Sequence, residues 1–136
     1  MKDYKLKISI LCVLAIANLF WLDPYRDRVD EGNKKYHAKK FDEARKSYDE
    51  AARYAPGERE KKKLRFNHGD ARYMQGDFEG AADEFREALK SEDRDVQKKA
   101  LFNMGNAYLK KGDVEKAVSA YMGSLAIDPN NRRAKK

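Results

Sequence analysis

Apolar residues follow two different patterns along the chain. Residues 8–22 read ISILCVLAIANLFWL, an uncharged run with only Ser9 and Asn18 as polar interruptions. Farther along, the apolar and small positions recur at the spacing of a helix face, with Val29, Gly32 and Tyr36 at i, i+3 and i+7. These patterns predict an all-α protein whose helices follow an apolar N-terminal segment.

The first pair of helices is marked by signals at its ends. Asp23 followed by Pro24 is a good helix start, because aspartate caps the free N–H groups and proline suits the first helical position. We predict one helix from about Tyr25 to Lys39 and its partner over Phe41–Tyr54, which ends before Pro56.

The same arrangement of helix ends comes back twice. Gly76-Asp77 and Gly112-Asp113 each place a glycine past one helix and a capping aspartate before the next. Asp128-Pro129 then closes the last copy. The helices are therefore expected in three successive pairs.

A set of small and aromatic residues recurs with these pairs at nearly constant spacing. Counted from the first glycine of each copy, alanine follows after 12 residues, an aromatic residue after 16 and a small residue after 19. The copies are offset by 37 and 36 residues, a period typical of a solenoid whose repeats pack only against their neighbours. The matching columns are Gly32, Gly69 and Gly105; Phe41, Phe78 and Val114; Ala44, Ala81 and Ala117; Tyr48, Phe85 and Tyr121; and Ala51, Ala88 and Ser124.

The small residues of these columns predict close helix contacts. The glycines let the first helix of a copy approach its partner, and the alanines do the same from the other side. We expect the aromatic residues to fill the wedge between successive copies.

The columns resemble the tetratricopeptide repeat (TPR) family over about residues 25–129, including the final proline at Pro56 and Pro129; the second copy has Asp93 there. The resemblance implies a right-handed solenoid of three helix-turn-helix repeats, at residues 24–57, 58–93 and 94–129. It also implies a concave groove, lined by the first helices, that binds a protein or peptide. The period exceeds the usual 34 residues of the family, which predicts longer first helices near 60–63 and 95–99.

The apolar run predicts a membrane anchor at residues 1–23. Counting Leu6, it covers about 25 Å as a helix, the low end for crossing a bilayer, and Phe20 and Trp21 lie where interfacial aromatic residues are expected. Lysines precede the run, so we expect a single-pass protein of the inner (cytoplasmic) membrane with its repeats on the extracytoplasmic side. The alternative is a signal peptide cleaved after Ala17, which gives a soluble periplasmic TPR assembly factor but leaves an exposed apolar N-terminus.

A narrower resemblance concerns the partner. The anchor, the Asp23-Pro24 pair, Gly32-Asn33 and the segment FNMGNAYLKKGDVEKAV at 102–118 are similar to the membrane-associated TPR proteins of bacterial aerotolerance (Bat) operons. This similarity implies a von Willebrand A-domain membrane protein as the partner, beside a chaperone-like ATPase.

The positive charge of the chain lies at its ends. Of the net charge of +7, the first seven residues contribute +2 and the last five contribute +4, which leaves +1 for the part between them. Nucleic-acid binding needs clustered lysine and arginine, so we expect no nucleic-acid partner for the repeats. The remaining alternative is a binder of nucleic acid or anionic lipid through the basic tail, residues 130–136, which also has the sequence of the start of a capping helix.

The sequence contains no set of residues at the spacing of a catalytic or metal site. His37 and His68 are 31 residues apart, without paired carboxylates or cysteines at ligand spacing, and His68 precedes Gly69, which favours a structural role. The single cysteine, Cys12, lies inside the apolar run and excludes an intramolecular disulfide. We predict a non-enzymatic protein that binds no cofactor and no metal.

The resemblance also indicates which residues face the groove. Asparagine side chains bond to peptide backbones and aromatic side chains supply contact area. The expected groove residues are Asn33, Tyr36 and His37 in the first repeat, Phe66, Asn67, Asp70 and Tyr73 in the second, and Lys99, Phe102, Asn103, Asn106 and Lys110 in the third. For Tyr36, Phe66 and Tyr73, packing between the first helices is the alternative role.

TPR domains that capture chaperone C-terminal tails hold the terminal carboxylate with lysines, asparagines and an arginine. Asn33, Asn67 and Lys99 stand at matching positions, whereas Val29 replaces a lysine and Asn103 the arginine. Two cationic groups are missing, so we expect a different extended ligand.

The last repeat lacks a complete capping helix in the sequence. Solenoids cover their terminal apolar face with such a helix. We therefore expect partial exposure of Leu109, Val118, Leu125 and Ile127. This surface is expected to recruit a partner or a second copy of the protein, unless the short tail folds back over it.

Overall fold

Residues 23–128 are described by the computed structural model, and this part of the chain contains six α-helices and no strand. The helices are α2 (Pro24–His37), α3 (Phe41–Tyr54), α4 (Glu58–Met74), α5 (Phe78–Ala88), α6 (Arg94–Lys111) and α7 (Val114–Ile127).

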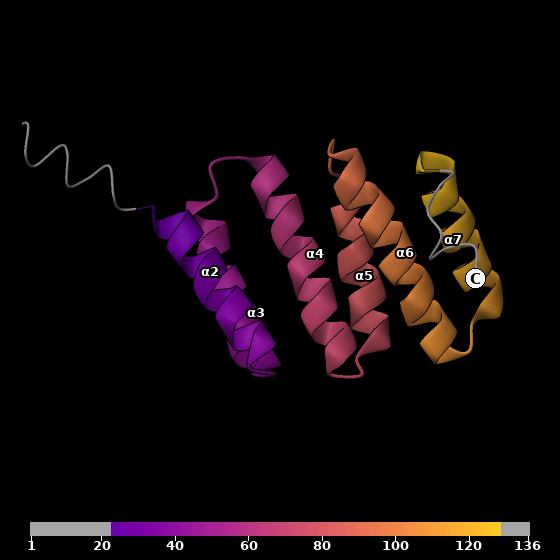
Figure 1. The fold of residues 1–136 in the computed structure, drawn as a ribbon, viewed down its shortest axis with the longest axis horizontal. Helices are drawn as coiled ribbons and strands as arrows, with labels where there is room; N and C mark the ends of the chain where they lie inside the picture. Colours follow the sequence, from indigo (N-terminus) through magenta and orange to yellow (C-terminus); the bar gives the residue numbers. More distant parts are fainter. Residues whose placement is uncertain (1–22, 129–136) are drawn as a thin grey trace, which may run out of the picture.

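The helices form three pairs that stand side by side along the long axis of the molecule (Figure 1). The members of each pair are in contact, and successive pairs meet through α3 with α4 and α5 with α6. The first helices α4 and α6 also touch each other directly. The predicted all-α solenoid of three helix pairs is therefore confirmed.

Several of the helix ends carry the predicted capping residues. The side chains of Asp23, Asp77 and Asp113 accept hydrogen bonds from backbone N–H groups three residues later, at 2.9–3.2 Å. Gly76 and Gly112 both have φ of +82°, the left-handed conformation that ends a helix and suits glycine. These local signals explain why the predicted helix ends in the second and third pairs agree with the structure.

The turn between α2 and α3 departs from this pattern. The position that glycine holds in the other turns is Lys39 here, with φ of +60°, and the N-cap of α3 is Lys40, whose side chain makes no capping hydrogen bond. The predicted helix to Lys39 is therefore too long: α2 ends at His37, because Lys39 leaves the helical conformation.

The recurring spacing of glycine and aromatic residues in the three repeats has a direct packing reason. A Cβ atom added to Gly32 would lie 2.3 Å from the ring of Tyr48, and one on Gly69 or Gly105 would lie 2.5 Å from Phe85 or Tyr121. The predicted close approach within each pair is confirmed. The rings were expected between successive repeats, but each one lies on the glycine of its own repeat. Tyr48 also reaches the next repeat, where its ring packs against His68.

The first helices of the second and third pairs are longer than α2, as the repeat period predicted. They have 17 and 18 residues, against 14 in α2. Asp93, which stands in place of the family proline, caps α6 by accepting hydrogen bonds from the N–H groups of Asp95 and Val96.

The predicted anchor and the basic tail lie outside the described residues. Between residues 23 and 128, none of the helices combines the length and the apolar character needed to cross a bilayer. At the C-terminal end of the solenoid, Leu109 and Val118 are about half exposed, at 53% and 50%, and Leu125 and Ile127 are partly exposed, as expected.

Candidate functional site

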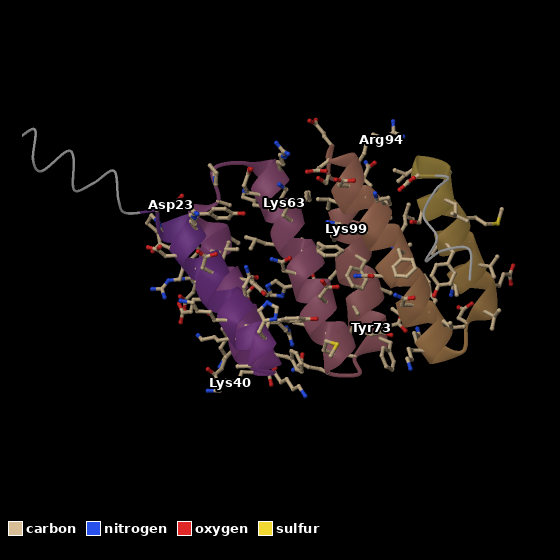
Figure 2. All side chains as sticks on the ribbon, viewed as in Figure 1. Asp23, Lys40, Lys63, Tyr73, Arg94 and Lys99 are labelled. Carbon is tan, nitrogen blue, oxygen red and sulfur yellow. The ribbon has the colours of Figure 1, made fainter. Side chains whose placement is uncertain are left out.

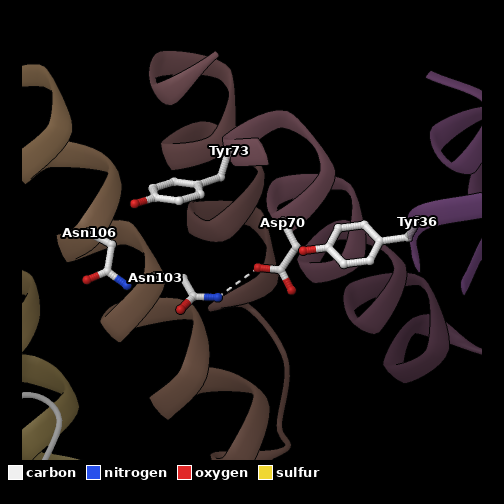
Figure 3. Close-up of a pocket in the computed structure, with 5 residues that line it drawn as sticks. All are labelled: Tyr36, Asp70, Tyr73, Asn103 and Asn106. Atoms are coloured by element: carbon white, nitrogen blue, oxygen red, sulfur yellow. Dashed lines mark hydrogen bonds between the residues drawn. The ribbon is translucent and has the colours of Figure 1, made fainter. Parts of the chain in front are cut away.

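A pocket of about 260 Å³ opens between the first helices of the three pairs. Tyr36 comes from α2, Asp70 and Tyr73 from α4, and Asn103 and Asn106 from α6 (Figure 3). All five are among the predicted groove residues, and the other predicted residues lie outside this pocket. In Figure 2, the labels Lys63 and Tyr73 mark two positions along α4, and Arg94 and Lys99 mark the first part of α6.

The pocket is centred on a position that differs between the repeats. Asn33, Asp70 and Asn106 occupy the same place in their repeats. Asn33 accepts a hydrogen bond from the hydroxyl of Tyr48 at 3.0 Å, and Asn106 accepts one from Tyr121 at 2.7 Å. In the second repeat the aromatic residue is phenylalanine, which has no hydroxyl, and the amide is replaced by a carboxylate.

Asp70 is held by the next repeat instead. Its carboxylate accepts a hydrogen bond from Nδ2 of Asn103 at 2.7 Å. Burial raises the pKa of Asp70 to about 6, against the opposing effects of the Asn103 hydrogen bond and of the charge on Lys99. The pocket therefore contains a carboxylate whose ionised form is poorly stabilised by its surroundings.

Two tyrosine rings line the same pocket as this carboxylate. Tyr36 packs edge-on against Phe41 with 5.5 Å between ring centroids, and Tyr73 packs in the same way against Phe78 at 5.3 Å. Figure 3 shows the hydroxyl of Tyr36 directed toward Asp70. Burial, and then the negative charge of Asp70, raises the pKa of Tyr36. Both rings are held by the helix that follows, so the pocket walls are fixed before a ligand arrives.

The other predicted groove residues are not brought into this pocket. Phe66 and Phe102 pack against Phe85 and Tyr121, at 5.7 Å between ring centroids in each pair. The remaining members are Asn33, which bonds to Tyr48 inside its own repeat, Asn67, which is partly buried outside the pocket lining, and His37, Lys99 and Lys110, which are exposed.

The structural role predicted for His68 agrees with its surroundings. The imidazole is buried on the ring of Tyr48, and its Nε2 lies 3.1 Å from a carboxylate oxygen of Asp49. Burial is the main cause that lowers the pKa of His68. Within residues 23–128, no group of three or more His, Cys, Asp or Glu side chains is arranged to hold a metal ion.

The hydroxyl–amide pairs were missed by the sequence analysis, although a signal for them exists. Asparagine stands in the groove column where the aromatic column has tyrosine, and aspartate stands there where it has phenylalanine. The two columns are 15 residues apart and change together, which is the pattern of two side chains in contact.

A sequence model described as the tetratricopeptide repeat matches this chain at residues 29–95 and again at 66–132. Together the two matches cover most of the chain. No curated protein sequence matches it.

Solved structures with this fold cover about four fifths of the chain. The first TPR of Spaghetti (RPAP3), bound to the HSP90 peptide SRMEEVD, superposes with a TM-score of 0.71 and 24% identity, over 82% of this chain and 84% of the other. The second TPR domain of human RPAP3, in complex with the HSP70 peptide SGPTIEEVD, gives 0.71 and 20% over 82% and 89%.

A third similar structure has a longer chain. The TPR2AB domain of yeast Sti1, in a complex with HSP90, gives a TM-score of 0.72 with 28% identity, over 82% of this chain and 43% of that protein. All three similarities extend along the whole described solenoid, rather than over one helix pair.

Proposed function

The chain belongs to the tetratricopeptide repeat family, a family of protein-interaction modules, and from this premise we propose that it is a non-enzymatic scaffold that binds an extended segment of another protein along the groove of α2, α4 and α6. The proposal rests on the pocket between these helices, because side chains from all three repeats line it together. A ligand seated there touches every repeat at once.

The peptides bound by the solved relatives are not a guide to the ligand of this chain. SRMEEVD and SGPTIEEVD both end in Glu-Glu-Val-Asp, an acidic sequence. The pocket described above presents the carboxylate of Asp70 and lacks two cationic members of a carboxylate clamp. Like charges repel, so acidic tails of this kind are poor candidates for this groove.

Photocrosslinking from defined positions tests the groove. We would place a photoreactive amino acid at His37 or Lys110, which are exposed beside the groove, and at Lys46 or Glu115 as matched exposed positions on the second helices. The same partner should be captured from native membranes at the two groove positions and not at the controls. Equal capture from both faces, or capture from the second helices alone, contradicts the groove as the working surface.

We also propose that residues 1–23 anchor the protein in the inner membrane with the repeats on the extracytoplasmic side. The uncharged run at 8–22 and the lysines that precede it support this arrangement. The similarity to the TPR proteins of Bat operons supports a von Willebrand A-domain membrane protein as the partner.

The intact mass of the protein recovered from washed membranes tests the anchor. The full mass in the membrane fraction agrees with an anchor, and degradation of the repeats by protease added to spheroplasts agrees with the orientation. A mature protein that begins at Asn18 and washes off the membrane supports the cleaved periplasmic form instead.

A second surface supports self-association at the C-terminal end. Val114, Val118 and Met122 form a stripe on α7, each four residues from the next, and are 58%, 50% and 65% exposed. If this stripe joins two copies, Val118→Lys together with Met122→Lys shifts the sedimenting species to the monomer, whereas Ser119→Lys on the same helix does not. A wild-type protein that already sediments as a monomer excludes this role.

A further inference from the structure

We propose that the pocket between α2, α4 and α6 receives a lysine or arginine side chain of the bound segment, whose cation pairs with Asp70 while Tyr36 and Tyr73 enclose its aliphatic part. This inference rests on the proposed function, since it names the chemistry of a ligand in the same groove.

The carboxylate of Asp70 has unused capacity to accept hydrogen bonds. An ionised carboxylate offers about four acceptor sites. The only hydrogen bond that it receives from the described residues comes from Asn103, and none of their lysines or arginines forms an ion pair with it. A cationic side chain entering the pocket would supply the missing donors and the missing charge.

The solenoid itself does not require a charge at this position. In the first and third repeats a neutral amide, on Asn33 or Asn106, completes the contact with a tyrosine hydroxyl. In the second repeat Phe85 leaves no hydroxyl to satisfy, and an asparagine at position 70 could still accept from Asn103. The charge is therefore the property of Asp70 that packing leaves unexplained.

The charged and titratable groups around Asp70 leave this charge uncompensated. Tyr36 faces it from α2 and Tyr73 lies beside it on α4, while α6 brings the neutral amides of Asn103 and Asn106. Lys99 on α6 acts only through its field, and its side chain is exposed. Burial raises the pKa of Asp70 in this setting, and a bound cation would lower that pKa again.

The size and walls of the pocket suit one side chain. At about 260 Å³ it is smaller than the ~300–1,000 Å³ typical of sites for whole small molecules. Tyrosine faces attract cations and cover the methylene groups of lysine and arginine. The rings of Tyr36 and Tyr73 are already fixed by Phe41 and Phe78, so little freedom is lost when a side chain enters.

Selection from a random peptide library displayed on phage tests this inference. The full chain, kept in detergent micelles because of its apolar N-terminal segment, would be used as wild type, as Asp70→Asn and as Asp83→Asn. Asp83 is an exposed carboxylate on α5, so its replacement changes the net charge equally outside the groove. We expect a lysine or arginine at one fixed position in the peptides selected by wild type and by Asp83→Asn, and its loss with Asp70→Asn.

A double-mutant cycle on one selected peptide then assigns the contact. Replacing its basic residue by glutamine, or Asp70 by asparagine, should each weaken binding by about tenfold, and the two changes together should add little more. Peptides that bind the groove without a basic preference, or an affinity that is unchanged in Asp70→Asn, overturn the inference and leave the scaffold function standing. Selection of no groove-binding peptide overturns both.

Discussion

The carboxylate of Asp70 is held in a site where two of the three repeats use an amide. Because burial raises its pKa in the folded protein to about 6, from an ordinary value of 3.8, the ionised form opposes folding. The residue thus represents a local conflict between the stability of the solenoid and the chemistry of its groove, and such conflicts concentrate at functional sites.

Asp70→Asn is expected to stabilise the domain at pH 7. The folded-state pKa lies above the unfolded one, so the wild type loses stability as the pH rises from about 4 through 6, and the variant does not. After allowance for solvent screening, we expect a gain of about 1–2 kcal/mol at pH 7 that disappears below pH 4. Urea denaturation of both proteins at pH 4 and pH 7 measures it, and an equal difference at the two pH values contradicts it.

Gly69→Ala is expected to destabilise the second repeat by about 1–3 kcal/mol. The added Cβ atom would lie 2.5 Å from the ring of Phe85, which is fully buried and cannot move aside. Gly57→Ala is the matched control, because its Cβ meets only Glu60 at 3.4 Å and its φ of −170° suits any residue. The control should change stability by less than about 1 kcal/mol. Thermal unfolding of the two variants compares them, and equal losses would refute the packing argument.

At the scale of the elements, the turn between α2 and α3 is the least favourable connection of the three pairs. Lys39 adopts the left-handed conformation that Gly76 and Gly112 adopt in the other turns, and Lys40 takes the place of their capping aspartates. The backbone angles of Lys40, −91° and 65°, are close to those of Asp77, −80° and 72°. The geometry of a cap is therefore present without the side chain that completes it.

The double variant Lys39→Gly/Lys40→Asp is expected to raise stability. Glycine removes a steric cost of about 1 kcal/mol, and aspartate adds a cap of similar size. The ion pair of Lys40 with Glu43 is lost, but it is exposed and contributes little. The change in midpoint of chemical denaturation is the measurement. Gly76→Lys serves as the reverse experiment and should lower the midpoint. Midpoints that equal that of the wild type in both variants would contradict this prediction.

The helices and their ends could be predicted from the sequence because caps, prolines and glycines act locally. The first turn was the exception, since Lys39 carries no local signal for its conformation. The candidate site was predictable only as a face of the first helices. Which side chains converge depends on directions set by packing: Phe66 and Phe102 turn toward the second helices, whereas Tyr36 and Tyr73 reach the pocket. The bond from Asn103 to Asp70 spans two repeats, which no single-repeat pattern contains.

At the scale of the whole molecule, the buried residues fall into two clusters of unequal extent. The larger one joins α5, α6 and α7 around Phe85, with Phe66 and Tyr73 of α4 packed against it. The smaller one joins α3 to Leu64 of α4, with Tyr25, Val29 and Tyr36 at its margin. A solenoid is held by contacts between neighbours, so its repeats need not open together.

We therefore expect α2 and α3 to open at a lower free energy than α5 and α6. Native-state hydrogen exchange of the full chain measures this directly: amides of α2 should exchange faster than those of α5, and their protection should be lost at lower denaturant. A single opening energy for all six helices would show that the solenoid behaves as one cooperative unit and contradict the prediction.

The first and third repeats pair a tyrosine with an asparagine, and the second repeat has phenylalanine and aspartate instead. The acidic position can therefore be moved to another repeat by exchanging these two residues. Exchanging the pairs, with Asn33→Asp and Tyr48→Phe in the first repeat and Asp70→Asn and Phe85→Tyr in the second, moves the carboxylate by one repeat and alters no helix boundary. On the inference above, the contact with the cation of a bound segment would then move from α4 to α2. On that inference, the register of a bound segment follows the repeat that carries the carboxylate.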